Sequence, residues 1–384
     1  MLAAPSRAVA PAVVPEDPFA LLPRGAVVAV AMSGGVDSSV AAARCVARGI
    51  ETVGITLALW PGDREQVRDR GCCSIDAVED ARRVATGLGI RHLTWNLEGE
   101  FSAAVVAGFE AGYAAGRTPN PCVRCNQRVK FGVLLDRARA IGATHVATGH
   151  YARIGRRGDT WTLHRAREAG KDQSYTLHRL DQAQLEGAVF PLGGVSAKAE
   201  VREEAARLGL VTAAKPDSQE LCFVEDDLVS ELSRRLAGRF RPGPIEDRAG
   251  RVLGEHRGLP FYTVGQRSRL AIRPDRPDAA PLYVLEVDAS ANRVVVGPVE
   301  ALRRNGLRAS DCRWVSGKPL ETGTPVEAQL RAHGRGHPAR VAATGAATLE
   351  VRFAEPASQV SPGQSVVLYQ GDEVAGGGVV EASL

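Results

Sequence analysis

Seven consecutive residues near the start of the chain have the types and spacing of a loop that binds phosphate. The segment Ser33-Gly34-Gly35-Val36-Asp37-Ser38-Ser39 lies between the valine-rich apolar run 26–32 and the alanine-rich stretch 40–48. The apolar run predicts a buried parallel strand, and the alanine-rich stretch predicts a helix. Two glycines let backbone amides approach an anion, and the helix N-terminus adds partial positive charge. This pattern predicts a site for the phosphates of a nucleotide.

The loop differs from the two commonest nucleotide-binding patterns. It lacks the lysine of Gly-x-x-x-x-Gly-Lys-Ser/Thr, and it does not fit Gly-x-Gly-x-x-Gly. Its serine hydroxyls and backbone amides suit pyrophosphate, and the carboxylate of Asp37 could bind a metal ion. In the simpler alternative, Asp37 and Ser38 only cap the helix.

The same residues resemble the pyrophosphatase loop of the ATP-pyrophosphatase superfamily. Members of that superfamily split ATP into AMP and pyrophosphate while they activate a carbonyl oxygen as an adenylate. Amidation, argininosuccinate formation and tRNA thiolation all use this loop. The resemblance therefore implies ATP as a substrate and leaves the reaction open.

Three cysteines form the second group of residues that could do chemistry. Cys122 and Cys125 form a Cys-x-x-Cys pair beside a predicted helix start, close to Arg124, and Cys222 lies far along the chain. The helix dipole and the nearby cation favour the reactive thiolate. The pair fits a redox dithiol, half of a zinc site, ligands of an iron–sulfur cluster or two inert thiols. Sulfur transfer is favoured because a thiolate can carry a terminal sulfur as a persulfide and the chain also has a carbonyl-activating loop.

Composition limits the class of protein. The chain has 384 residues, of which 44% are hydrophobic and 24% charged, so it can bury a large core and form two or three domains. A net charge of +4 permits binding of nucleic acid without establishing it. Seven unevenly spaced cysteines indicate reduced thiols in the cytoplasm rather than a secreted disulfide scaffold. Adjacent Cys72 and Cys73 fit small buried residues better than metal ligands.

Strands and helices alternate in the first half of the chain. Strands are predicted at 52–60, 92–97 and 143–148, and helices at 76–88, 101–115 and 129–140. This order predicts a doubly wound parallel sheet with its ligand site at the carboxyl ends of the strands. Gly149-His150-Tyr151 follows such an end, so His150 could touch a ligand or could be a capping or core histidine.

The second half of the chain changes character. Residues 239–276 are rich in Arg, Gly and Pro with interspersed aromatics, which suits either RNA contacts or a basic linker. Short alternating runs from Tyr283 onward predict an antiparallel β-barrel. We expect a flexible leader over 1–24, an α/β adenylation domain over 25–216, a small central domain over 217–300 and a barrel domain over 301–384.

Several further motifs now select one branch of the superfamily. Together with the loop, they resemble those of the tRNA-specific 2-thiouridylases, in the same order from about residue 26 to the C-terminus. The motifs are Gly116-Arg117-Thr118-Pro119-Asn120-Pro121, Cys125-Asn126, Ala147-Thr148-Gly149-His150-Tyr151, Lys171-Asp172-Gln173-Ser174-Tyr175, Asp217-Ser218, Cys222-Phe223, Thr263-Val264-Gly265-Gln266-Arg267 and Pro362-Gly363-Gln364-Ser365.

This resemblance implies a substrate and a mechanism. The substrate is the wobble uridine of a tRNA anticodon, and ATP, with Mg²⁺, adenylates its C2 oxygen. A persulfide on Cys222 then replaces AMP, and Cys125 frees the sulfur by forming a disulfide with Cys222. The sulfur comes from a persulfide donor such as a cysteine desulfurase or a relay protein. The central domain would contact tRNA.

The family's binding positions also carry over by resemblance. Those for ATP are Ala31, Met32, Ser33, Gly34, Gly35, Val36, Asp37, Ser38, Leu57 and Gly149. Those for the target base are Asn120, Pro121 and Cys122. Those for tRNA are His150, Lys171, Asp172, Gln173, Arg331, Ala332 and Gln364. An Arg-Tyr pair is frequent where this chain has Arg331-Ala332, and alanine offers no ring for stacking.

One departure concerns the chemistry itself. The family often has an aspartate where this chain has Cys122, and a cysteine can act as a base only as a thiolate. We therefore consider a hypothesis in which Cys122, Cys125 and Cys222 converge on a [4Fe-4S] cluster with one open iron.

Two rival functions stay open at the level of sequence. Another ATP-dependent ligase of the superfamily, such as an amidating enzyme, would not need Cys125 and Cys222. A tRNA-binding or redox protein without ATP chemistry would use the Gly-Gly turn only as structure.

Overall fold

The computed structural model describes residues 10–59, 75–217, 221–224, 227–270, 272, 280–358 and 360–384. The predictions for Cys72, Cys73 and Ser218 lie outside these ranges. Within these ranges, no helix has both the length and the apolar composition needed to span a membrane.

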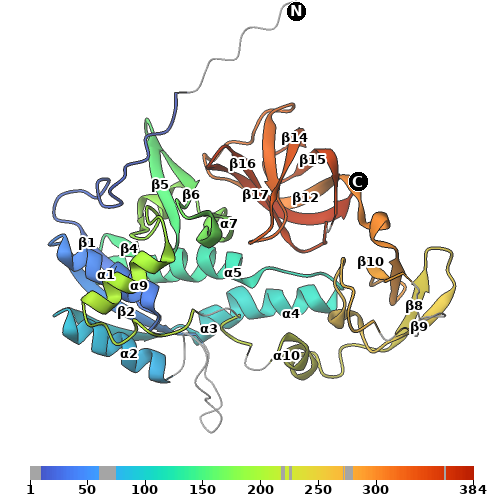
Figure 1. Ribbon diagram of the computed structural model, residues 1–384, viewed down its shortest axis with the longest axis horizontal. Helices are drawn as coiled ribbons and strands as arrows, with labels where there is room; N and C mark the ends of the chain where they lie inside the picture. Colours follow the sequence, from blue (N-terminus) through green and yellow to red (C-terminus); the bar gives the residue numbers. More distant parts are fainter. Residues whose placement is uncertain are drawn as a thin grey trace, which may run out of the picture.

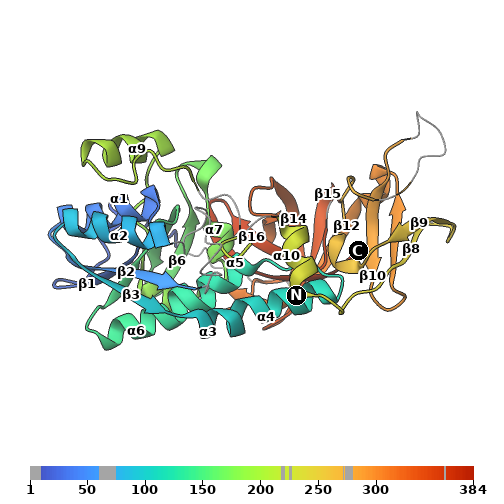
Figure 2. The same ribbon diagram turned by 90° about the horizontal axis from the view of Figure 1, so that it is seen from below.

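A five-stranded parallel sheet forms the first part of the chain, in the order β3-β2-β1-β4-β7. Helices cover both faces, with α1, α2 and α9 on one side and α3, α4 and α6 on the other (Figures 1 and 2). The doubly wound prediction is therefore confirmed. The strands are β1 (Val27–Ala31), β2 (Glu51–Ala58), β3 (Arg91–Asn96), β4 (His145–Ala147) and β7 (Ala188–Val189). The helices are α1 (Val36–Ala47), α2 (Ile75–Gly87), α3 (Glu98–Phe101), α4 (Ala107–Ala114), α5 (Pro121–Arg124), α6 (Leu134–Ala140), α7 (Ser174–Leu177), α8 (Gln182–Glu186) and α9 (Lys198–Arg207).

Side chains of β1 divide the core between the two faces of the sheet. Val28 and Val30 pack with α1, α2 and α9, whereas Ala29 packs with the helices of the other face. A buried parallel strand needs apolar residues on both faces, which is why 26–32 is continuously apolar.

The helix that contains Cys125 begins earlier than predicted. Instead of a start at Val129, α5 starts at Pro121 and runs through the π-helical segment η2 (Cys125–Val133) into α6. The Asn120 side chain accepts hydrogen bonds from the amides of Cys122 and Val123 (3.1 and 3.4 Å), and Pro121 occupies the first helical position. A second π-helical segment, η1 (Ser102–Val106), joins α3 to α4. Both cysteines of the pair thus lie inside a helix.

The C-terminal strands form a closed antiparallel barrel, as predicted. Its order is β12-β15-β14-β13-β16-β17, and β12 also pairs with β17. The hairpin of β5 (Ala152–Arg157) and β6 (Thr160–Arg165), which emerges between β4 and β7, extends this sheet beside β17. The barrel strands are β12 (Arg304–Trp314), β13 (Pro325–Gln329), β14 (Gly336–Thr344), β15 (Leu349–Ala357), β16 (Ser365–Gln370) and β17 (Glu373–Ser383).

A small sheet lies between these two parts in sequence and at the far end of the molecule from α1 (Figure 1). Its order is β10-β11-β8-β9, with Ile245, Val284, Val294 and Val296 in its core. The strands are β8 (Gly243–Asp247), β9 (Val252–His256), β10 (Tyr283–Asp288) and β11 (Arg293–Gly297), preceded by α10 (Leu228–Arg235). Short 3-10 turns occur at Ala169–Lys171, Leu259–Phe261 and Val299–Leu302.

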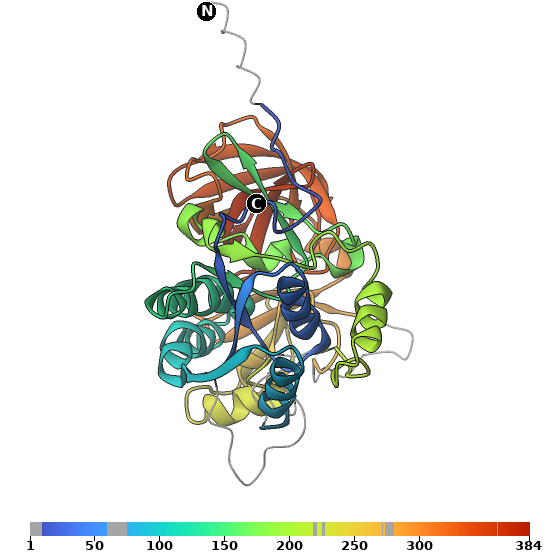
Figure 3. The same ribbon diagram turned by 90° about the vertical axis from the view of Figure 1, so that its left-hand side faces the viewer.

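Residues 10–24 do not form the expected flexible leader. Val13 pairs with Arg156 at the edge of β5 through two backbone hydrogen bonds of 2.8 and 2.9 Å. Phe19 is buried, and Arg48, the residue after α1, pairs with Asp17. In Figure 3 this dark blue segment descends beside the β5–β6 hairpin. An open strand edge and an apolar side chain thus place this segment against the folded chain, where a flexible leader was predicted.

The contact between the barrel and α7 buries a histidine and predicts pH-dependent stability. His178 is fully buried, and a Cβ at Gly377 of β17 would lie 2.8 Å from its ring. Burial lowers the pKa of His178 to about 3. The unfolded chain therefore binds a proton below about pH 6.5 that the folded chain does not, and stability falls as the pH drops.

We expect the free energy of unfolding to fall by about 2 kcal/mol through His178 between pH 7 and pH 5. Urea unfolding at both pH values checks this. In His178→Gln, which cannot titrate, the difference between the two pH values should shrink by that amount. An unchanged difference would show that His178 is protonated in the fold.

Candidate functional site

Glycine is required at the turn between β1 and α1. Gly34 has φ of +68°, and a Cβ there would lie 2.1 Å from the carbonyl oxygen of Ala77 in α2. Ser33 and Ser38 bond to each other across the loop, with their hydroxyl oxygens 3.2 Å apart. The N-cap residue Gly35 provides no side-chain cap to α1. The first amides of α1 therefore keep their capacity to bind an anion.

Asp37 points toward the neighbouring strand ends instead of capping α1. Its carboxylate accepts a hydrogen bond from the Tyr151 hydroxyl (2.8 Å) and forms an ion pair with Lys198 at the start of α9. Burial and the adjacent Asp37 charge raise the pKa of Tyr151. A Cβ at Gly149 would lie 2.8 Å from the Asp37 Cβ. The structure thus brings the Gly149-His150-Tyr151 segment to the loop.

Asp217 gathers three cations beside this loop. Lys171 (2.9 Å), Lys198 (3.2 Å) and Arg202 (2.7 Å) all form ion pairs with its carboxylate. Burial opposes ionisation of Asp217, but hydrogen bonds from Lys171 and Lys198 outweigh it and lower its pKa. Lys198 links Asp217 directly to Asp37.

Sequence reasoning missed Lys198 and Arg202. Both lie on α9, which follows β7, two strands from β1 in the sheet order. The order of strands and helices contained a signal for them, because helices that follow neighbouring parallel strands all begin at the same edge of the sheet.

Two of the positions expected to contact tRNA are buried. The His150 ring bonds to the Thr148 hydroxyl (2.8 Å), and burial and then the Lys130 charge lower its pKa well below the ordinary value. Asp172 accepts hydrogen bonds from the Ala166 amide (2.9 Å) and from the Ser174 hydroxyl (2.8 Å). These groups hold the site together, and their contact with tRNA stays a prediction.

The other expected tRNA positions differ in their surroundings. The Gln173 side chain accepts from the Tyr151 amide (3.0 Å), which ties it to the loop region. Arg331 is exposed, and Gln329 donates to the carbonyls of Arg331 and Ala332 (2.9 and 3.0 Å). The structure therefore leaves Arg331 accessible at the surface of the barrel.

Cys125 and Cys222 contact the same apolar cluster. Cys125 is 7% exposed inside it, and the partly buried Cys222 packs against it. Phe223 anchors the Cys222 segment, because its ring lies 5.7 Å from that of Phe101 and 5.0 Å from that of Phe109. Cys122, in contrast, is exposed.

The three cysteines do not fit an iron–sulfur cluster in this structure. Within the described ranges, which include all three, no group of three or more His, Cys, Asp or Glu side chains could hold a metal ion. Cys122 is exposed, Cys125 is buried and Cys222 is intermediate in exposure. The structure gives no support to the cluster hypothesis.

Thr118 joins the three parts of the chain. Its amide donates to Pro362 of the barrel domain (3.0 Å), and its hydroxyl lies 3.0 Å from that of Thr263. Its carbonyl accepts from the Gln364 side chain (3.0 Å). Three motifs far apart in sequence therefore meet on one residue, and Gln364 contributes to this junction.

Family models match the chain in three successive segments. They are described as tRNA methyl transferase HUP domain (residues 26–226), tRNA methyl transferase PRC-barrel domain (232–298) and aminomethyltransferase beta-barrel domain (304–380). The tRNA-specific 2-thiouridylase MnmA of Heliobacterium modesticaldum is 47% identical over 93% of this chain and 93% of that protein. The protein of the same name from Geobacter metallireducens is 48% identical over 93% of this chain and 97% of its own.

This chain belongs to the tRNA-specific 2-thiouridylase family. A third member, from Streptomyces coelicolor, is 46% identical over 93% of this chain and 95% of its own length. The resemblance inferred from the motifs is thereby confirmed. The three folded parts follow the same order as the three matched segments. They are a parallel sheet, a small sheet and a closed barrel.

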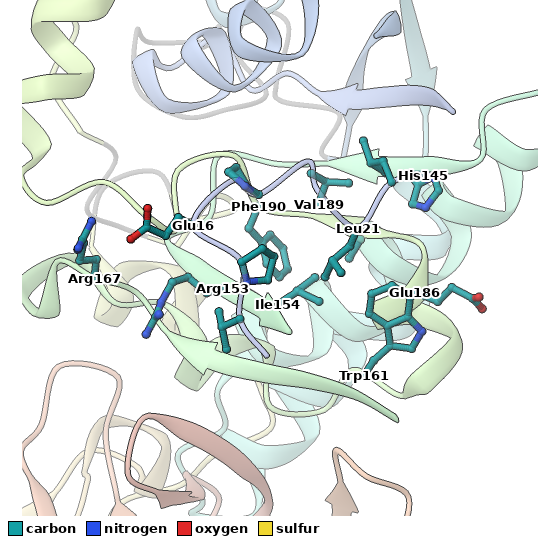
Figure 4. Close-up of a pocket in the computed structure, with 16 residues that line it drawn as sticks. Glu16, Leu21, His145, Arg153, Ile154, Trp161, Arg167, Glu186, Val189 and Phe190 are labelled. Atoms are coloured by element: carbon teal, nitrogen blue, oxygen red, sulfur yellow. The ribbon is translucent and has the colours of Figure 1, made fainter. Parts of the chain in front are cut away.

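A cavity of about 250 Å³ in this family member lies away from the phosphate loop. It opens between residues 14–22, the β5–β6 hairpin and the β7 edge of the sheet. Leu21, Ile154 and Phe190 line its apolar part, and Arg153 and Glu186 lie toward opposite ends (Figure 4). Its charged groups differ from those around Asp37, so it is not the candidate nucleotide site.

Alanine substitutions at Gly34 and Gly87 should have different effects on the stability of the fold. Gly34→Ala should destabilise the fold by at least about 2 kcal/mol, because of the positive φ and the clash with α2. Gly87→Ala in α2, where a Cβ meets no atom within 4 Å, should be neutral or stabilising by up to about 1 kcal/mol. Urea unfolding of both variants checks this. Equal stability of the two variants would mean that the loop relaxes freely.

Proposed function

We propose that the chain transfers sulfur to C2 of the wobble uridine of tRNA in an ATP-dependent reaction. One observation carries this proposal. Asp217, which pairs with Lys198 beside the phosphate loop, lies only five residues before Cys222. Five residues span at most about 18 Å, so Cys222 is tethered close to the loop. Its segment also packs against the cluster that contains Cys125.

The loop side of the site suits adenylation. The uncapped amides of α1 and the cations Lys171, Lys198 and Arg202 can bind the phosphates of ATP, which would replace the carboxylates as their counter-ions. Lys198 is the most enclosed of these cations, with 12% of its side chain exposed. Mg²⁺ commonly binds through one or two carboxylates plus substrate phosphates, and Asp37 could supply a carboxylate. Such an ion would neutralise phosphate charge.

The cysteine side suits transfer of a sulfane sulfur. The terminal sulfur of a Cys222 persulfide attacks C2, and AMP leaves with the electrons of the C2–O bond. The Cys125 thiolate then attacks the Cys222 sulfur. The bond between the Cys222 sulfur and the sulfur attached to C2 breaks, and the attached sulfur stays on the ring. Cys125 and Cys222 become a disulfide, which an external dithiol must reduce before the next turnover. A persulfide-bearing donor protein supplies the sulfane sulfur.

Substrate contacts follow from the same arrangement. Asn120 caps α5, and Pro121 and exposed Cys122 are its first two residues, with Cys122 three residues before Cys125. We assign the contact with the target base to this turn. Exposed Arg331, with Ala332, and the partly exposed Lys171 can contact tRNA outside the reacting base.

Separate measurement of AMP and 2-thiouridine tests the proposal. With tRNA, ATP, Mg²⁺ and a persulfide donor, Lys198→Ala should reduce AMP and thiouridine together by about a hundredfold, because phosphate charge is less stabilised. Cys222→Ser should abolish thiouridine. AMP should then form only through the slower attack of water on the adenylated uridine. Mass spectrometry of nucleosides and a coupled AMP assay give both quantities.

Cys45→Ala is the matched control. Cys45 is buried in α1, burial raises its pKa to about 12, and its removal should change neither product. Full thiouridine formation by Cys222→Ser would refute the sulfur-transfer route. Failure of the unaltered protein to release AMP with tRNA would refute the adenylation route.

A further inference from the structure

A carboxylate from the barrel reaches the helical turn that carries the cysteine pair. Asp311 of β12 forms ion pairs with Arg124, which lies between Cys122 and Cys125, and with Arg179 (2.8 Å). Arg179 also donates to the backbone carbonyl of Asp311 (2.6 Å) and to the Gln127 side chain (2.9 Å). The contact therefore spans α5 and the first turn of η2.

The backbone of β12 is distorted at this residue. Asp311 has φ of +47°, and the pairing of β12 with β17 shifts by one residue between Ser310 and Arg313. A bulge of this kind aims both the carboxylate and the carbonyl of Asp311 away from the regular ladder. A non-glycine residue with positive φ costs of order 1 kcal/mol, although aspartate tolerates it better than most residues.

Stability does not account for the pair between Asp311 and Arg124. Arg124 and Asp311 have 37% and 40% of their side chains exposed, and ion pairs of that exposure contribute about 0 to 1 kcal/mol. That gain is no larger than the strain at Asp311. Arg179 is 2% exposed, so its charge needs a counter-ion whatever the position of the Cys122–Cys125 turn. What the contact adds is a fixed position for Arg124.

We propose that Asp311 is a positioning residue, through which the barrel holds the Cys122–Cys125 turn in the geometry needed for sulfur transfer. The inference rests on the proposed function. The Asn120 cap fixes the start of the turn, and the pairs of Asp311 with Arg124 and Arg179 fix its other side. The barrel thereby contributes to a site whose thiols it does not carry.

Asp311→Gly tests the proposal without disturbing the backbone. Glycine adopts positive φ freely and retains the carbonyl that Arg179 binds. Because it removes the carboxylate beside the buried Arg179, the variant should lose about 3 kcal/mol of stability, so the assays are run well below its melting temperature. Loss of the carboxylate should reduce thiouridine formed per AMP released by about tenfold, since small misplacements of reacting groups are costly. Asp311→Asn keeps one acceptor oxygen and should restore part of this ratio.

Asp372→Asn is the control. Asp372 pairs with Arg153 and His164 where the barrel meets the β5–β6 hairpin, and its replacement should leave the ratio unchanged. An unaltered ratio in Asp311→Gly would overturn the proposal. So would a parallel loss of AMP and thiouridine, which would indicate a purely structural role.

A second measurement needs neither ATP nor tRNA. N-ethylmaleimide labelling of the full chain, resolved by peptide mass spectrometry, reports on access to Cys125, with buried Cys45 as internal reference. In Asp311→Gly, labelling of Cys125 should accelerate by about tenfold relative to Cys45. Unchanged labelling would overturn the proposal even if the chain proved not to thiolate tRNA, and a failure of the proposed function would appear only in the product assays.

Discussion

The ion pairs around Asp217 hold together the parts of the site that the chain supplies from distant segments. Positive charge gathers beside the β1–α1 loop, and without a counter-ion Lys171, Lys198 and Arg202 would repel one another. Asp217 neutralises them and at the same time fixes the start of the segment that leads to Cys222. One carboxylate thus compensates the charge beside the β1–α1 loop, five residues before Cys222 in the chain.

The barrel is attached to the first part of the chain through several polar contacts. The hairpin continues its sheet beside β17, Thr118 bonds to Pro362 and Gln364, and Asp311 reaches Arg124. Each contact involves a residue next to a motif of the site. Docking of the barrel therefore affects the geometry of the cysteine turn as well as any surface offered to tRNA.

Local pattern was informative wherever one segment determines its own structure. The strand, glycine turn and helix around Gly34 could be predicted because a buried strand, a φ-positive turn and an alanine-rich helix each follow from neighbouring residues. The barrel followed from alternating short runs. The start of α5 was placed too late, because its signal, the Asn120 cap followed by Pro121, was read as part of a loop.

By itself, the sequence determined the family and the fold class, since these depend on motifs and periodicity. It also suggested the two kinds of chemistry that we propose. Only the tertiary structure decided which charges neutralise each other. Asp37 meets Lys198 161 positions away, and Arg124 meets Asp311 187 positions away. It also decided that His150 and Asp172 are buried. Among the described residues, it brings together no group of three or more His, Cys, Asp or Glu side chains that could hold a metal ion. Burial and charge pairing are properties of segments brought together in space, and no local spacing specifies them.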